Sequence, residues 1–360
     1  MERRLGHRPA LDGIRGVAIA AVVAQHAFGI PSAGYLGVDL FFVLSGFLIT
    51  TLLLEEHAEH GVISLRAFYR RRALRLLPAL LVAISVLLLV ELGLAATGRG
   101  HLRREATGAL FGVAYITDLA RLRASAINVP GTLGHLWSLA VEEQFYVLWP
   151  LALVLLRAHR RRTQLVLLVA LALTIFQQLR LVAAGAPYQR LAFAPDTRGS
   201  SILIGCLAAF LWTRRRPLVV GPRVGACAFI LLPLMLFPSF VRLEFAGPLV
   251  LFGLAAAIVV LRALEPGSDE GRLLGSRPLV ALGQISYGLY LWHPLVLHAF
   301  GAPPRGFSAR GVAGVAGAIL VAAASRRVVE LPFLRRKRRV DVALPLPLPA
   351  PAERPIVVAG

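Results

Sequence analysis

The stretch LDGIRGVAIAAVVAQH, residues 11–26, is an apolar helical pattern with an arginine near its start and a histidine near its end. Arg15 and His26 are eleven residues apart. At about 100° per residue, this spacing places both side chains within roughly 20° of one helix face, about 16 Å apart along the axis. Ionisable groups inside a membrane helix are costly, so they usually mark a pathway or a reaction site. We therefore expect Arg15 and His26 to be functional.

The composition is typical of a multi-span membrane protein. Of the 360 residues, 57% are hydrophobic and 16% are charged, and the mean hydropathy is +0.70, outside the range of ordinary soluble domains. The net charge of +20 comes from short basic blocks between apolar runs, which act as topology signals and not as one nucleic-acid-binding patch. Both cysteines lie in apolar runs without metal-ligand spacing. We expect contact with membrane lipid, no nucleic acid and no metal.

Eleven apolar windows are candidates for membrane spans. They lie near residues 14–30, 35–54, 74–96, 107–120, 135–157, 164–184, 197–213, 224–240, 245–264, 278–300 and 309–325. If 107–120 also crossed, the basic segments 157–162, 213–217 and 326–339 would all face outside, against the positive-inside rule. The expected fold is an all-α integral membrane protein with about ten transmembrane helices, both termini in the cytoplasm, and one extra re-entrant or peripheral helix at 107–120.

The chain is expected to form one transmembrane domain, residues 1–339, in the cell membrane. The remaining residues, 340–360, include the proline-rich run LPLPLPAPAERP, which predicts a disordered cytoplasmic tail. No clear cleavage pattern follows the basic N-terminus, so the first span is expected to be retained.

A carboxylate interrupts the second apolar run, GYLGVDLFFVLSGFLIT. In the first interpretation, Asp39 sits at a helix interface or pairs locally; in the second, it pairs with Arg15 or orients His26. The second possibility arises because a helical hairpin places the first two spans side by side. Both interpretations are open at the level of the sequence.

A basic motif follows in SLRAFYRRRALRLLP, where Arg71, Arg72 and Arg75 lie against the start of the third apolar run. The positive-inside rule alone explains the presence of charge. A ligand with several phosphates also explains the spacing, because the forked guanidinium group matches phosphate oxygens in geometry.

The segment GHLWSLAVEEQFYVLWP places Ser138 and Glu142 one helical turn apart on one face. Adjacent acids in a membrane helix are rarely present for packing alone, so Glu142 is the expected catalytic member. Trp137 and Tyr146 are typical of an aromatic belt at the membrane surface. Together with Ser138, they are also candidates for binding substrate.

Two later segments, PDTRGSSILIG and ALGQISYGLYLWHPLV, add polar groups. Asp196 and Arg198 are either a structural ion pair at an outer helix end or part of a substrate site. Tyr290 is a further candidate for binding substrate. A lone histidine such as His293 is more often a hydrogen-bonded packing residue than a catalyst.

Together these segments resemble the acyltransferase 3 family of integral membrane acyltransferases. The resemblance runs almost end to end, from LDGIRGVAIAAVVAQH through GYLGVDLFFVLSGFLI, FYRRRALRLLP and HLWSLAVEEQFYVLWP to ISYGLYLWHP and VVELPF. The terminal E-[R/K]-P pattern of the family is replaced by Glu330-Leu331-Pro332. The functional residues of the family fall on Arg15 and His26, on Arg71, Arg72 and Arg75, and on Trp137, Ser138 and Glu142.

The resemblance implies an O-acyltransferase. An acyl group, most commonly acetyl, would pass from cytoplasmic acyl-CoA to a hydroxyl of a sugar, a cell-envelope glycan or a glycosylated natural product. Some members of the family carry a soluble esterase-like domain that completes transfer to exported glycans. Since no such segment is present here, either a separate extracytoplasmic acceptor protein performs that step or the membrane domain acts alone.

The expected mechanism uses the basic motif to hold the CoA phosphates and His26 to take the proton from the acceptor hydroxyl. A covalent acyl-histidine relay is the other possibility. Glu142 or Asp39 would orient the imidazole, and Arg15 would bind a donor phosphate or the developing oxyanion. The competing interpretation is a proton-coupled transporter or flippase, in which intramembrane charges form a proton relay.

Overall fold

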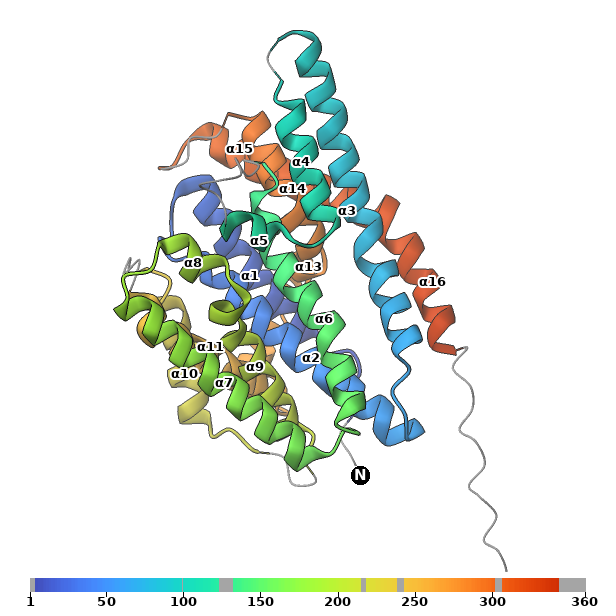
Figure 1. The fold of residues 1–360 in the computed structure, drawn as a ribbon, viewed down its shortest axis with the longest axis vertical. Helices are drawn as coiled ribbons and strands as arrows, with labels where there is room; N and C mark the ends of the chain where they lie inside the picture. The colour runs from blue at the N-terminus through green and yellow to red at the C-terminus, as the bar shows by residue number, and fades with distance from the viewer. Residues whose placement is uncertain are drawn as a thin grey trace, which may run out of the picture.

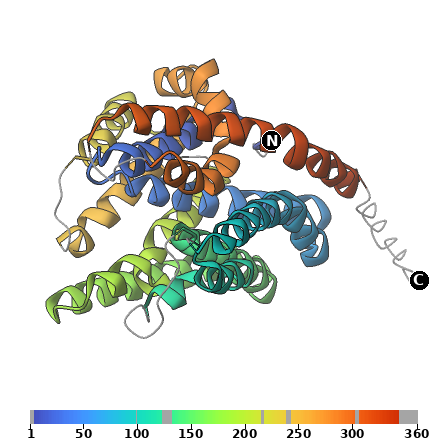
Figure 2. The same cartoon turned by 90° about the horizontal axis from the view of Figure 1, so that it is seen from above.

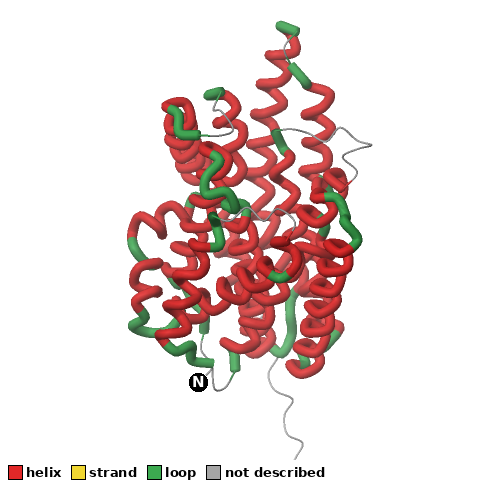
Figure 3. Tube along the Cα trace, turned by 90° about the vertical axis from the view of Figure 1, so that its left-hand side faces the viewer, coloured by secondary structure: helices red, strands yellow, loops and turns green. Residues whose placement is uncertain are grey.

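Helices are the only regular secondary structure in residues 4–98, 100–122, 132–214, 218–237, 243–301 and 306–342, which the computed structural model describes (Figures 1 and 3). The α-helices are α1 (Pro9–Phe28), α2 (Leu36–His60), α3 (Leu65–Ala96), α4 (Leu102–Val113), α5 (Thr117–Leu122), α6 (Trp137–Leu155), α7 (Arg160–Ala183), α8 (Tyr188–Phe193), α9 (Pro195–Trp212), α10 (Pro222–Leu234), α11 (Pro248–Ala263), α12 (Asp269–Leu274), α13 (Arg277–Gln284), α14 (Ser286–Ala299), α15 (Ala309–Ser325) and α16 (Leu331–Val342). Short turns of other helix types are η1 (Gly134–Leu136), η2 (Leu243–Ala246) and the π-turn η3 (Arg326–Glu330). The expectation of an all-α fold is confirmed.

Six helical segments of the described chain are long and apolar enough to cross a membrane. They are Pro9–Phe28, Leu36–His60, Leu65–Ala96, Gly134–Leu155, Arg160–Ala183 and Ala309–Arg336. The count of about ten crossings and the cytoplasmic position of both termini stay predictions. The tail predicted for 340–360 lies outside the described residues from 343 onward, and α16 continues to Val342.

The window 107–120 does not form one continuous helix. It is divided between the end of α4 and the short α5, with a break at residues 114–116. By contrast, α3 has 32 residues, which corresponds to about 48 Å, longer than the hydrocarbon core of about 30 Å. In Figure 1, α3 and α4 project together beyond the rest of the bundle.

The first helix begins and ends at residues that suit those positions. Pro9 occupies the first turn, where its missing N–H is not needed, and Asp12 adds a negative charge near the positive end of the helix dipole. Gly29 ends the helix in the left-handed conformation, with φ 74°, and its N–H donates to the carbonyl of Gln25. A short connection then leads into α2, which packs along α1.

Helices α2 and α9 approach closely through two glycines that face each other. A Cβ on Gly46 would lie 2.1 Å from the Ile202 carbonyl oxygen, and a Cβ on Gly205 would lie 2.1 Å from the Val43 carbonyl oxygen. Small residues at such crossings let helix backbones pack closely in membranes. This contact fixes α2 against α9 and therefore fixes the side chains that α2 presents to the site.

The C-terminal helices form a continuous rod on one side of the bundle. Figure 2 shows α15, the π-turn η3 and α16 running end to end. Within the π-turn, Glu330 is buried and faces Gly288 of α14, where a Cβ would lie 2.9 Å from the carboxylate oxygen. The glycine therefore makes room for the acid of the altered terminal motif.

The close crossing of α2 and α9 predicts that Gly205→Ala destabilises the protein by about 1–3 kcal/mol, because the new methyl group overlaps backbone atoms of α2. Gly199 lies on the same helix with nothing within 4 Å of its Cβ position. Gly199→Ala should therefore leave stability unchanged or raise it by up to about 1 kcal/mol. Thermal unfolding of the full chain in one detergent measures both variants. Equal effects would contradict the close approach.

Candidate active site

Three arginines converge on a cavity of about 90 Å³ between α1, α2, α3, α6 and α14. Arg15 comes from α1, and Arg72 and Arg75 come from successive turns of α3. We call this space the arginine cavity; its other polar lining residues are Ser45, Ser138, Glu142, Tyr146, Ser286, Tyr287 and Tyr290. Guanidinium groups therefore outnumber carboxylates in the lining, and the cavity has a net positive charge.

Glu142 is the one carboxylate among the lining residues of the arginine cavity. Its Oε1 accepts a hydrogen bond from Ser45 at 2.9 Å, and its Oε2 lies 3.4 Å from the hydroxyl of Tyr146. The expectation that Glu142 orients His26 is therefore wrong, because its carboxylate contacts Ser45 and Tyr146 in the arginine cavity, which His26 does not line. Ser138 and Glu142 do share one face, as their four-residue spacing predicts.

The expected basic motif divides into two parts. Arg71 pairs with Glu56 at 2.9 Å and is absent from the lining of the arginine cavity. The guanidinium of Arg72 lies over the Tyr146 ring, 4.4 Å from its centroid. Arg72 and Arg75 are thus the members of the motif that face the cavity.

Arg15 has a partner that the sequence interpretation missed. Its Nη1 donates to Asp12 at 2.9 Å, one turn earlier in α1. The spacing of three residues within LDGIRG is the signal that predicts this pair. Asp39, the partner considered from the sequence, lies elsewhere.

A second and larger cavity, of about 720 Å³, opens near the end of α1. We call it the histidine cavity, because His26 and His135 line it together with Arg121 and Arg198. The side chain of His26 is exposed in this space. Arg15 and His26 therefore line two different cavities, although both belong to α1.

The position of the proton on His26 follows from its hydrogen bond. The Nδ1 atom lies 2.8 Å from the carbonyl oxygen of Val22, one turn earlier. Since a carbonyl oxygen only accepts, Nδ1 carries the hydrogen and Nε2 of the neutral ring keeps its lone pair. The backbone of α1 thus holds His26 in the tautomer that a general base needs at Nε2.

Two further histidines surround His26, and neither was expected to be functional. His293 packs edge-to-face on His26 with 5.0 Å between ring centroids, and His135 lies 5.6 Å from His293. Both are buried, and the Nε2 atoms of both find no hydrogen-bond partner among the described residues. In the same part of the chain, no three His, Cys, Asp or Glu side chains are grouped so as to hold a metal ion.

Asp39 neither pairs with Arg15 nor orients His26, so the second possibility is wrong; it lies at a helix interface, as the first possibility has it. Its Oδ2 lies 2.6 Å from Nη2 of Arg198, and its Oδ1 accepts from Ser201 at 3.1 Å. The Asp39 and Arg198 side chains are 0% and 2% exposed. A charge buried this deeply needs an opposite charge beside it, and Arg198 of α9 provides that charge.

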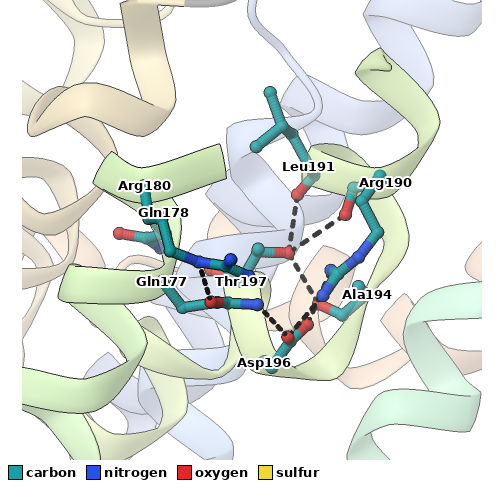
Figure 4. A network of polar contacts seen from close by, with 8 residues as sticks. All are labelled: Gln177, Gln178, Arg180, Arg190, Leu191, Ala194, Asp196 and Thr197. Atoms are coloured by element: carbon teal, nitrogen blue, oxygen red, sulfur yellow. Dashed lines mark hydrogen bonds and ion pairs between the residues drawn. The ribbon is translucent and has the colours of Figure 1, made fainter. Parts of the chain in front are cut away.

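The ion pair considered between Asp196 and Arg198 is also absent. Asp196 instead pairs with Arg190, with 2.7 Å between Oδ1 and Nη1, and accepts from Gln177 (Figure 4). Residues two apart on a helix point to nearly opposite sides, so Asp196 and Arg198 cannot meet. Asp196 lines neither cavity, whereas Arg198 lines the histidine cavity.

The aromatic residues lie inside the bundle and do not form a belt. Trp137 is 8% exposed and Tyr146 is 5% exposed. Trp137 lines the histidine cavity and stacks under Arg198, 5.4 Å from its guanidinium carbon, while Tyr146 lines the arginine cavity. The prediction of a belt is therefore wrong for both, because each packs on an arginine within the protein.

The two cavities meet at Val38 and Tyr290, which line both. The Tyr290 hydroxyl donates to the backbone carbonyl of His135, so the Ser138 hydroxyl, 2.6 Å away, is the donor to Tyr290. The hydrogen bond between Ser138 and Tyr290 thus lies between the arginine cavity and the histidine cavity.

Six apolar helices around buried ionisable groups define a multi-pass membrane protein with an internal site. A family model described as an acyltransferase domain, Acyl_transf_3, matches residues 8–326. The chain therefore belongs to the acyltransferase 3 family, as its motifs predict.

Curated relatives come from several bacteria. The peptidoglycan O-acetyltransferase OatA of Listeria monocytogenes is 30% identical over 347 residues, covering 90% of this chain and 55% of the relative. A "Putative O-acetyltransferase" of Staphylococcus aureus is 32% identical over 82% of this chain and 51% of the relative. The "Putative peptidoglycan O-acetyltransferase YrhL" of Bacillus subtilis is 33% identical over 79% and 48%. The chain thus spans about half the length of these relatives. No solved structure matches it.

The two aspartate–arginine pairs give a matched test of burial. Asp39→Asn removes the countercharge of a fully buried arginine and should cost about 3–5 kcal/mol. Asp196→Asn breaks a pair whose carboxylate side chain is 48% exposed and should cost about 0–1 kcal/mol. Unfolding midpoints in detergent compare the two variants. Similar losses would show that the Asp39 pair is not the buried contact described above.

Proposed function

We propose that the protein is an O-acetyltransferase that moves an acetyl group from acetyl-CoA to a hydroxyl of a cell-envelope carbohydrate. The observation that supports this most directly is the meeting of two different cavities, one lined by three arginines and one containing His26. Membership of the acyltransferase family and the peptidoglycan O-acetyltransferase relatives support the reaction class.

The donor is assigned to the arginine cavity. Arg72 and Arg75 make no hydrogen bond or ion pair with a described residue, so their guanidinium groups are available to an anion. Arginine binds phosphate oxygens through its planar fork and keeps its charge when buried. By the positive-inside rule, the basic start of α3 would lie at the cytoplasmic face of the cell membrane. The donor would then enter the arginine cavity from the cytoplasm.

The acceptor is assigned to the histidine cavity, where His26 acts as general base. Nε2 of His26 takes the proton of the acceptor hydroxyl while the hydroxyl oxygen attacks the thioester carbonyl carbon. As the new O–C bond forms, the C–S bond breaks, and the CoA thiolate leaves and is protonated. An ester and free CoA result. Arg15 supplies positive charge to a donor phosphate in the arginine cavity.

This assignment predicts that His26→Ala lowers acceptor-dependent CoA release by about 10²–10⁴-fold, the usual contribution of a positioned general base. Free CoA is measured with acetyl-CoA and soluble peptidoglycan fragments, in membranes with quantified protein. His298→Ala is the control, because His298 is exposed on α14 and lines neither cavity. Full activity of His26→Ala would overturn the role of His26. A wild-type chain that releases no CoA would favour a transporter.

The donor assignment predicts that Arg72→Gln and Arg75→Gln each raise the KM for acetyl-CoA by roughly 10–150-fold, equivalent to one charged hydrogen bond of about 1.5–3 kcal/mol. With S-acetylpantetheine, which has no phosphate, both variants should match the wild type. Arg70→Gln is the control, since Arg70 is exposed on the same helix and absent from the cavity. Equal losses with both donors would show that these arginines do not bind phosphate.

A further inference from the structure

Tyr290 occupies the boundary between the two cavities. It projects from α14, is 6% exposed, and lines the arginine cavity and the histidine cavity at once. Its hydroxyl is held by two other segments, the Ser138 side chain of α6 and the His135 carbonyl of η1. Two segments distant in sequence, residues 135–138 and α14, therefore hold one phenol ring in place.

Two neighbouring histidines pack against this ring. The imidazole rings of His135 and His293 pack against it, with centroids 5.3 and 5.8 Å away. Ser138, which donates to its hydroxyl, lines the arginine cavity. The tyrosine thus has the donor space on one side and the histidine cluster on the other.

Water in the histidine cavity lies beside the proposed general base, which the arginine cavity lacks. A cavity of about 720 Å³ with an exposed His26 has room for many water molecules. A base that removes a proton from a sugar hydroxyl also removes one from water. If water reached the thioester, its oxygen would bond to the carbonyl carbon, the C–S bond would break, and acetate and CoA would form without transfer. Active sites avoid such side reactions by excluding water until the correct substrate is bound.

We propose that Tyr290 is the barrier that keeps the donor thioester from water in the histidine cavity, and so directs the acetyl group to the acceptor. This inference rests on the proposed function. In the closed arrangement, Ser138 and the His135 carbonyl hold the ring between the cavities. Transfer requires the ring to move when the acceptor fills the histidine cavity.

The test measures CoA release from acetyl-CoA by the full chain in membranes, with and without soluble peptidoglycan fragments. Tyr290→Ala should raise the ratio of acceptor-independent to acceptor-dependent release by about tenfold or more, a change in discrimination typical of altered pockets. Adding His26→Ala to Tyr290→Ala should abolish the extra hydrolysis, because the water that enters is activated by His26. Tyr69→Ala is the matched control: Tyr69 also donates to a backbone carbonyl, that of Val147, but lines neither cavity.

A proportional fall of both reactions in Tyr290→Ala, or an unchanged ratio, overturns the inference. If Tyr290→Ala does not accumulate, Tyr290→Phe and Ser138→Ala replace it, because each keeps an aromatic ring at the boundary and removes hydrogen bonds that hold it. Both should raise the ratio in the same direction by a smaller factor, and a wild-type ratio in both overturns the proposal. Failure of the proposed function is recognised separately, since the wild-type chain would then release no CoA in response to acceptor.

Discussion

The buried pair between Asp39 and Arg198 is the contact on which the site depends. It joins α2 to α9 with 2.6 Å between charged atoms and almost no solvent, beside the crossing formed by Gly46 and Gly205. A lone charge at this depth would be strongly destabilising, so the pair fixes both helices. The fixed α2 then presents Ser45 to the arginine cavity and Val38 to the boundary.

The same pairing determines which acids remain near His26. Asp39 is occupied by Arg198, and Glu142 lies in the arginine cavity. His26 is therefore oriented by the Val22 carbonyl, where hydrolase triads use a carboxylate. A carbonyl still fixes the tautomer, and the ring of His293 packs edge-to-face on the imidazole, with 5.0 Å between ring centroids. No carboxylate is therefore among the described residues that line the histidine cavity.

Local spacing within one helix was enough to predict part of this site. The positions of Arg15 and His26, and the shared face of Ser138 and Glu142, follow from helical periodicity alone. The partner of Asp39 does not, because Arg198 is 159 residues away and only the packing of α2 on α9 brings them together. His293 was interpreted as a packing residue for the same reason: its neighbour, His26, lies on the first helix. The number of membrane crossings does not follow from hydropathy alone, since short helices such as α11 are also apolar.

The unequal volumes of the cavities bear on how the reaction is arranged. Under the proposed assignment, the acyl group would occupy the space of about 90 Å³ on the arginine side, and the acceptor would occupy the larger space of about 720 Å³ on the histidine side. In the proposed reaction, a thioester bound on one side and a base on the other do not react until they share one space. The boundary must therefore be closed firmly enough to exclude water and weakly enough to open during turnover. Two hydrogen bonds on a single phenol satisfy both conditions, because each neutral bond is worth only about 0.5–1.5 kcal/mol.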